Sequence, residues 1–243
     1  MTRAVCFVAA LILLTAGDGA HAEEPGYHQR TFKTADGAEM AYAISVPKGD
    51  QSVPRPLVLA LHPGGERPPY YGSWFARLVV VPALADVPAV LVAPDCPTKT
   101  WAEPGADRAV MALLEKVMAE QTIDRRRILV TGFSMGGRGT WFFSAQHPAF
   151  FTAAIPMAAS TGEMSAEMLA KMPTYIVHSR RDERVPFGPA ELNAQALEKL
   201  GRVVQFDAVE DLGHFQMGGY VPALKRAVRW VTERWGADRS TSR

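Results

Sequence analysis

Short apolar runs alternate along this chain with longer stretches in which apolar residues recur at helical spacing. A run of about four to eight apolar residues, rich in β-branched side chains, is typical of a buried strand. Such runs predict strands at Pro56–Leu61, Ala89–Ala93, Arg127–Thr131, Phe151–Met157, Thr174–His178 and Val203–Val209. Helical spacing predicts helices over Ser73–Ala85, Ala106–Ala119, Arg138–Gln146, Pro189–Leu200 and Gln216–Trp235. Because strands and helices alternate, the pattern predicts an α/β fold with a mostly parallel central sheet and helices on both faces.

Two segments before this alternation have the pattern of half-buried strands. His28–Thr34 and Glu39–Val46 flank the turn signal Ala35-Asp36-Gly37. Strand-like runs joined by a short glycine-containing turn predict an antiparallel hairpin. We therefore expect a hairpin at the start of the domain.

The first 22 residues depart from this organisation. Arg3 precedes an apolar run over Ala4–Ala16, and Ala20-His21-Ala22 supplies small residues for a cleavage point. This is the pattern of a secretory signal peptide. The alternative is a membrane anchor, but the run is shorter than the roughly 20 residues that a spanning helix needs. For a bacterial source we expect a periplasmic or secreted protein without stable membrane association after cleavage.

Composition limits the classes of ligand. The chain has 243 residues, is 48% hydrophobic and has a formal net charge of +1. Near-zero charge gives no electrostatic footprint for nucleic acid, and we find neither metal-ligand spacing nor a glycine-rich phosphate loop. After loss of Cys6 only Cys96 remains, so no internal disulfide can form. We expect a single domain over residues 23–235 with no cofactor or metal, followed by a disordered tail over residues 236–243.

A serine between glycines carries the strongest chemical signal. Gly132-Phe133-Ser134-Met135-Gly136 follows a predicted strand and precedes a predicted helix. A sharp strand-to-helix turn of this kind raises a serine hydroxyl at the carboxyl end of a sheet, as in a nucleophile elbow. The alternative is a glycine-rich turn that merely contains a serine, so the rest of the chain has to decide.

A serine nucleophile needs a nearby base, and His214 is placed to supply one. It follows the last predicted strand and precedes the final helix, so its loop lies at the carboxyl edge of the sheet. The alternative is a loop histidine without a role. We expect His178 to be a core or strand-end residue, and His147 to complement a helix dipole.

The imidazole needs a carboxylate to fix its tautomer, and Asp182 is the candidate. It lies just after the strand Thr174–His178, between Ser134 and His214 in the chain. Glu183 and Asp211 are competitors, although Asp211 is very close to His214 along the backbone. The other interpretation of Asp182 is a solvated residue that pairs with neighbouring arginines.

Donors for an oxyanion would come from two backbone positions. The first is the N–H of Met135, directly after the elbow serine. The second belongs to the loop after Pro56–Leu61, where Pro63 has no N–H to give. Gly64 is the first choice and Gly65 the fallback, while the alternative for Pro-Gly-Gly is a plain turn. His62 is expected to be structural.

The surroundings of this site indicate an open pocket. Only Ala158–Met172 separates two predicted strands at the place where a cap would enter, so there is no room for a large lid. Tyr70, Tyr71 and Trp101 are candidates for an aromatic rim. For the neighbouring Trp74 and Phe75, packing of the core is an equal alternative.

Taken together, these residues resemble the α/β-hydrolase superfamily. Within it, the chain is similar to exported esterase and peptidase-like families related to polyhydroxybutyrate depolymerases and feruloyl esterases. The resemblance covers most of the mature chain and rests on Leu61-His62-Pro63-Gly64-Gly65-Glu66-Arg67, Ala93-Pro94-Asp95-Cys96-Pro97 with Trp101, Gly132-Phe133-Ser134-Met135-Gly136-Gly137-Arg138-Gly139-Thr140-Trp141, Asp182-Glu183-Arg184-Val185-Pro186 and Gly213-His214. One departure is Pro63, where these families commonly have glycine after the histidine.

The resemblance and the residues together predict a serine esterase. Ser134 would attack a carboxylic ester of a small or polymeric substrate while His214, held by Asp182, takes its proton. A serine peptidase of the prolyl-oligopeptidase type would use the same three residues. A catalytically silent binding protein on the same scaffold is the alternative from another class.

Overall fold

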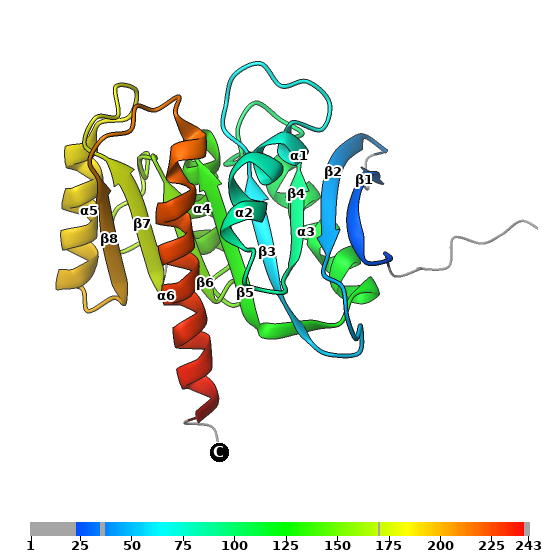
Figure 1. Ribbon diagram of the computed structural model, residues 1–243. Helices are drawn as coiled ribbons and strands as arrows, with labels where there is room; N and C mark the ends of the chain where they lie inside the picture. The colour runs from blue at the N-terminus through cyan, green and yellow to red at the C-terminus, as the bar shows by residue number, and fades with distance from the viewer. Residues whose placement is uncertain (1–22, 35–36, 170, 241–243) are drawn as a thin grey trace, which may run out of the picture.

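The computed structural model describes residues 23–34, 37–169 and 171–240 (Figure 1). Eight strands in this part of the chain form one sheet in the order β1-β2-β4-β3-β5-β6-β7-β8. Their bounds are Gly26–Lys33, Glu39–Val46, Arg55–Leu61, Val90–Pro94, Ile123–Phe133, Ala153–Met157, Thr174–Ser179 and Val204–Val209 for β1 to β8. β2 is antiparallel to both β1 and β4, and every other pair is parallel. The predicted α/β fold with an N-terminal hairpin is confirmed.

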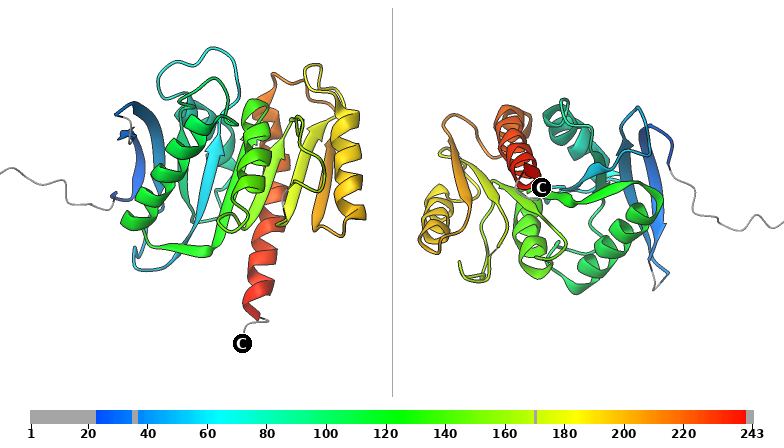
Figure 2. Two further views of the ribbon diagram at one scale, coloured as in Figure 1. Left: turned by 180° about the vertical axis from the view of Figure 1, so that it is seen from behind. Right: turned by 90° about the horizontal axis from the view of Figure 1, so that it is seen from below.

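Helices cover both faces of the sheet (Figure 2). Their bounds are Tyr71–Phe75 for α1, Val81–Ala83 for α2, Pro104–Glu120 for α3, Met135–Gln146 for α4, Phe187–Lys199 for α5 and Val221–Ser240 for α6. A π-helical turn, η1 (Ala76–Val80), joins α1 to α2, and a 3₁₀ turn, η2 (Met217–Tyr220), leads into α6. α1, α2 and α6 pack on one face, and α3, α4 and α5 pack on the other.

The central strand β3 shows why these runs form strands. Leu57, Leu59 and Leu61 pack with α3 on one face, while Val58 and Ala60 pack with α1 and α6 on the other. Side chains of a strand alternate between the faces, so a strand covered on both sides is a continuous apolar run. Its neighbours β4 and β5 bury their side chains in the same two layers.

Both ends of the chain differ from the rest in how they compare with the sequence-based expectations. The C-terminal helix continues to Ser240, so the predicted disorder of residues 236–240 is wrong. No proline follows Gly236, and the residues after it are compatible with a further helical turn. The predicted signal peptide, Ala35 and Asp36 of the hairpin turn, and residues 241–243 lie outside the described residues.

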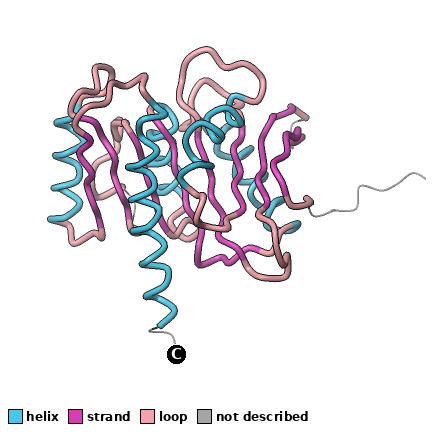
Figure 3. Tube along the Cα trace, in the orientation of Figure 1, coloured by secondary structure: helices cyan, strands magenta, loops and turns pink. Residues whose placement is uncertain are grey.

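The connections at the carboxyl ends of the parallel strands form one layer of loops (Figure 3). The loop between β6 and β7 contains neither helix nor strand in its described residues, so no cap domain enters there. None of the described helices is both long enough and apolar enough to span a membrane. The loops after β3, β5, β7 and β8 carry the predicted site.

Candidate active site

Ser134 is the only residue between β5 and α4. Its φ is 55° and its ψ is −114°, a conformation that non-glycine residues rarely adopt. The Ser134 N–H donates to the carbonyl of Met157 at 2.9 Å, which ties the turn to the end of β6. The chain therefore makes the strained strand-to-helix turn that the glycine spacing predicts.

The glycines around Ser134 are required by close backbone contacts. A Cβ on Gly132 would collide with the backbone of Gly136, and a Cβ on Gly136 would collide with the carbonyl of Leu61 at the end of β3. The elbow therefore sits directly against β3, closer than any side chain would allow.

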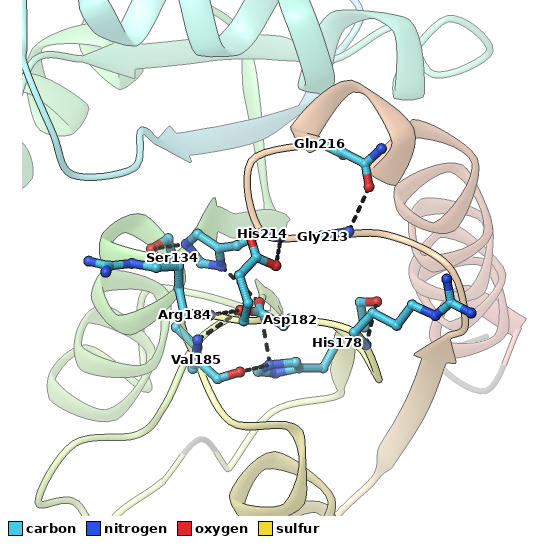
Figure 4. A network of polar contacts seen from close by, with 11 residues as sticks. Ser134, His178, Asp182, Arg184, Val185, Gly213, His214 and Gln216 are labelled. Carbon is cyan, nitrogen blue, oxygen red and sulfur yellow. Dashed lines mark hydrogen bonds and ion pairs between the residues drawn. The ribbon is translucent and has the colours of Figure 1, made fainter.

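His214 lies in the loop between β8 and η2, and its ring points at the elbow (Figure 4). Its Nε2 is 2.8 Å from Ser134 Oγ. The ring packs against Phe133 with a centroid distance of 5.1 Å. Gln216 holds the loop, because its side-chain oxygen accepts the N–H of Gly213 at 2.7 Å.

Asp182 lies in the loop after β7, and its carboxylate is fully buried. Oδ2 is 2.8 Å from His214 Nδ1, and Oδ1 accepts the N–H groups of Arg184 at 2.9 Å and Val185 at 2.7 Å. A carboxylate only accepts hydrogen bonds, so Nδ1 of His214 is the donor. The neutral imidazole then offers the lone pair of Nε2 to the hydroxyl of Ser134. The structure thus brings together the three side chains predicted from the sequence.

The two competing carboxylates have other positions. Glu183 accepts the backbone N–H of His214 at 3.0 Å, and this hydrogen bond lowers the pKa of its carboxyl. Glu183 therefore holds the histidine loop rather than the imidazole, a role that the sequence analysis missed. Asp211 is exposed and pairs with Arg181 at 3.3 Å.

His178 and His147 take no part in the hydrogen bonds that join Asp182, His214 and Ser134. His178 is buried at the end of β7, with Nε2 2.9 Å from the carbonyl of Val185 and 3.6 Å from Asp182 Oδ2. Burial lowers the pKa of this imidazole. His147 caps the C-terminus of α4, and its Nε2 is 2.6 Å from Asp107 Oδ1.

The two predicted oxyanion donors belong to adjacent backbone segments. A Cβ on Gly64 would lie 3.6 Å from the Cβ of Met135, so the two backbones are neighbours. Within the described chain no acceptor pairs with the N–H of Gly64, and Met135, as the first residue of α4, has no intrahelical acceptor. Gly65 has a φ of +113° and is exposed.

His62 supports the loop that carries Gly64. Its imidazole is fully buried, with Nε2 2.9 Å from the backbone N of Cys96 and Nδ1 2.7 Å from the carbonyl of Pro63. Burial lowers the pKa of His62 to about 4. The expectation that this histidine is structural agrees with these contacts.

The lowered pKa of His62 predicts that acid destabilises the protein. In the unfolded chain His62 is protonated below about pH 6.5, whereas in the folded protein it is protonated only below about pH 4. The free energy of unfolding should therefore fall by about 2 kcal/mol between pH 8 and pH 5 on account of this group. Urea titrations of the wild type and His62→Asn at both pH values measure it. An equal fall in the two proteins would contradict the assignment.

A pocket of about 470 Å³ opens above Ser134. Tyr71 lines it, as predicted, whereas Tyr70 does not. The prediction for Trp101 is wrong, because this side chain is 0% exposed and its Nε1 donates to the carbonyl of His62 at 3.0 Å. Sequence reasoning missed several lining residues, which are Arg184, Val185, Phe215 and Met217.

Another cavity, of about 300 Å³, lies at the opposite edge of the sheet. It is lined by the start of β5, including Arg125 and Arg127, and by Arg234 and Trp235 of α6. None of the predicted site residues lines it. The pocket above Ser134 is therefore the candidate active site.

A known protein family matches the part of the chain that contains this site. The model of the dienelactone hydrolase family matches residues 93–218, which include Ser134, Asp182 and His214. The chain belongs to the dienelactone hydrolase family. The match begins after Gly64, so the oxyanion loop lies outside it. A comparison with curated proteins finds no match.

Solved structures similar to this dienelactone hydrolase family member include an esterase and serine hydrolases. A thermostable esterase is 28% identical with a TM-score of 0.72; the alignment covers 85% of this chain and 62% of that one. An α/β serine hydrolase without lid from Xanthomonas campestris is 16% identical, with a TM-score of 0.67 and coverages of 88% and 97%. FphF, a fluorophosphonate-binding serine hydrolase of Staphylococcus aureus, is 15% identical, with a TM-score of 0.70 and coverages of 86% and 99%.

These comparisons fix the fold and the hydrolase family. The Xanthomonas campestris and Staphylococcus aureus structures are only 16% and 15% identical to this chain, so their similarity shows the fold alone. The predicted relation to polyhydroxybutyrate depolymerases and feruloyl esterases stays a prediction, as does export from the cell.

Proposed function

We propose that this protein hydrolyses carboxylic esters through an acyl-enzyme formed on Ser134. The observation that carries the proposal is the pair of 2.8 Å contacts that link Asp182 to His214 and His214 to Ser134. The similarity to a thermostable esterase supports the same substrate class.

In this mechanism Ser134 Oγ attacks the ester carbonyl while His214 Nε2 takes the hydroxyl proton. The buried carboxylate of Asp182 stabilises the imidazolium that forms. The N–H groups of Met135 and Gly64 bind the oxyanion of the tetrahedral intermediate. The intermediate collapses when His214 gives its proton to the departing alcohol. Water then attacks the acyl-enzyme, loses its proton to His214, and Ser134 recovers its own as the acid leaves.

The shape of the site favours small soluble esters or the exposed ends of a polymer. Among the residues that the structure describes, no cap covers the pocket, and Phe215, which lines it, is 72% exposed. Tyr71 in the pocket stacks on Trp74, with ring centroids 4.9 Å apart. These rings offer an apolar surface for the part of the substrate that extends beyond the reacting carbonyl.

The guanidinium of Arg184 predicts a preference for substrates with a negative charge. Arg184 lines the pocket, and no ion pair with a carboxylate is found for it in the described part of the chain. In Arg184→Gln, kcat/KM for an ester with a free carboxylate should fall about fivefold relative to the matched neutral ester, the effect of an exposed charge pair. Steady-state kinetics of both esters measure the ratio.

Arg180→Gln is the matched control, because Arg180 pairs with Glu210 outside the pocket. Its ratio of charged to neutral ester should equal that of the wild type. Equal losses for both esters in Arg184→Gln would contradict a role in charge recognition.

Ester and amide hydrolysis are distinguished by matched substrates. Kinetics on an ester and an anilide of the same acyl group should show turnover of the ester and at most slow cleavage of the anilide. Comparable kcat/KM values for both would favour the serine peptidase. Turnover of neither substrate by folded protein, across a panel of acyl groups, would favour the silent binding protein.

A further inference from the structure

The imidazole of His62 holds the peptide group whose N–H is the second oxyanion donor. His62 follows β3 directly, and it contacts neither Ser134 nor His214 in any hydrogen bond of the described chain. Both of its ring nitrogens are nevertheless engaged in the fully buried interior. Buried polar groups are normally hydrogen-bonded, so the role of His62 depends on which groups its two hydrogen bonds hold in place.

The partners of His62 determine its tautomer. The Cys96 backbone N–H, at 2.9 Å, can only donate, so Nε2 must present its lone pair. The proton of the neutral ring is then on Nδ1, which donates to the carbonyl of Pro63 at 2.7 Å. The Cys96 N–H, by donating to Nε2, thus determines that Nδ1 is the donor in the hydrogen bond to Pro63.

The Pro63 carbonyl and the Gly64 N–H belong to one planar peptide group. No cis peptide bond occurs in the described chain, so this N–H points away from the carbonyl. A donor that fixes the carbonyl therefore also fixes the direction of the Gly64 N–H. Hydrogen bonding to the carbonyl also polarises the group and strengthens the N–H as a donor.

The preceding peptide group is held in the same way. Trp101 Nε1 donates to the carbonyl of His62 at 3.0 Å. The Trp101 side chain packs closely on α4. A Cβ on Gly139 of this helix would lie only 2.6 Å from the Cβ of Trp101. Two successive peptide planes of the loop are therefore anchored by buried donors, and one anchor rests on the helix that follows Ser134.

We propose that His62 is a positioning residue for the oxyanion hole, in which its Nδ1–H orients the Pro63–Gly64 peptide so that the Gly64 N–H faces the tetrahedral intermediate. Pro63 cannot anchor the loop by a backbone N–H of its own, so the side chain supplies the constraint. The proposal rests on the proposed function, because it concerns the donor that this reaction needs.

Two substitutions separate the two ring nitrogens. In His62→Asn the amide nitrogen can take the place of Nδ1 and donate to Pro63. In His62→Gln the amide oxygen can take the place of Nε2 and accept from Cys96, but the Pro63 carbonyl loses its donor. Each variant keeps one of the two hydrogen bonds, so thermal unfolding should show similar destabilisation, and each serves as the folding control for the other.

The kinetic contrast tests the proposal. An oxyanion contact exists in the transition state and not in the ground state, so its loss lowers kcat and leaves KM unchanged. For one ester, His62→Gln should lose about 100-fold in kcat, the effect of one missing oxyanion donor, with KM within about twofold. His62→Asn should stay within about tenfold of the wild type. Affinity for a trifluoromethyl ketone, which forms a tetrahedral adduct on serine, should fall in parallel with kcat.

Equal losses of kcat in the two variants, or a loss that appears in KM instead, would overturn the proposal. A measurement on the wild type covers the case in which neither variant folds. Ring-nitrogen NMR should show the Nδ1-protonated tautomer for His62. This resonance can be recognised by contacts with the rings of Tyr71 and Trp101, whose centroids each lie 4.9 Å from that of His62. The Nε2-protonated tautomer would overturn it. Wild-type ester turnover is scored separately, so failure of the proposed function is distinguishable from failure of this inference.

Discussion

Replacing Ser134 with alanine should abolish ester hydrolysis and leave the fold intact. Without the hydroxyl no acyl-enzyme can form, and loss of a serine nucleophile lowers kcat by about 10⁶-fold in enzymes of this mechanism. Within the described residues the side chain of Ser134 makes one hydrogen bond, to His214, so its removal should change the free energy of unfolding little. Steady-state kinetics measure the loss, and circular dichroism with thermal unfolding shows whether the variant is folded.

Ser160→Ala is a matched control for this experiment. Ser160 is exposed in the loop after β6 and lies outside the pocket lining. Its kcat should equal that of the wild type. If Ser134→Ala retained wild-type activity, Ser134 could not be the nucleophile.

Asp182→Asn should lower kcat by about 10⁴-fold at neutral pH. Oδ1 of Asp182 accepts two backbone N–H groups, from Arg184 and Val185. An asparagine would keep its oxygen there and turn its NH₂ group toward His214. Nδ1 of His214 would then have to accept, so Nε2 would carry the proton and could not take one from Ser134. The pH dependence of kcat in the variant, compared with the wild type, measures this effect.

The neighbouring acids provide the comparison. Asp211→Asn, at an exposed surface pair, should change kcat by less than about twofold. Glu183→Gln retains an oxygen that can accept the His214 N–H, so its loss should stay below about tenfold. A larger loss in Glu183→Gln than in Asp182→Asn would reverse the assignment of the acid.

The sequence predicts the elbow and its partners well for a physical reason. Parallel strands bring their carboxyl ends to one edge, so residues just after β5, β7 and β8 must meet there. The glycines at 132 and 136 have no alternative role once the backbone contacts of the turn are seen. Chain order alone therefore leads from Ser134 to Asp182 and His214.

Side-chain direction in the long loops is what the sequence does not reveal. Trp101 is an aromatic residue of the kind that often lines a pocket. Its side chain is nevertheless buried in the interior, where its indole N–H donates to the carbonyl of His62. Phe215, next to the predicted base, was overlooked although it is exposed at the pocket. Glu183 and Asp182 are adjacent, and only the folded loop shows that one holds the His214 backbone and the other its ring.

Activation of Ser134 by His214 is tested most directly by labelling the purified protein with a fluorophosphonate probe, followed by mass spectrometry of the modified peptide. An activated serine reacts with such a probe, whereas an ordinary surface serine does not. We expect modification at Ser134 in the wild type and its loss in His214→Ala. Folded wild-type protein that remains unlabelled, or labelling of Ser134 that is unchanged in His214→Ala, would contradict it.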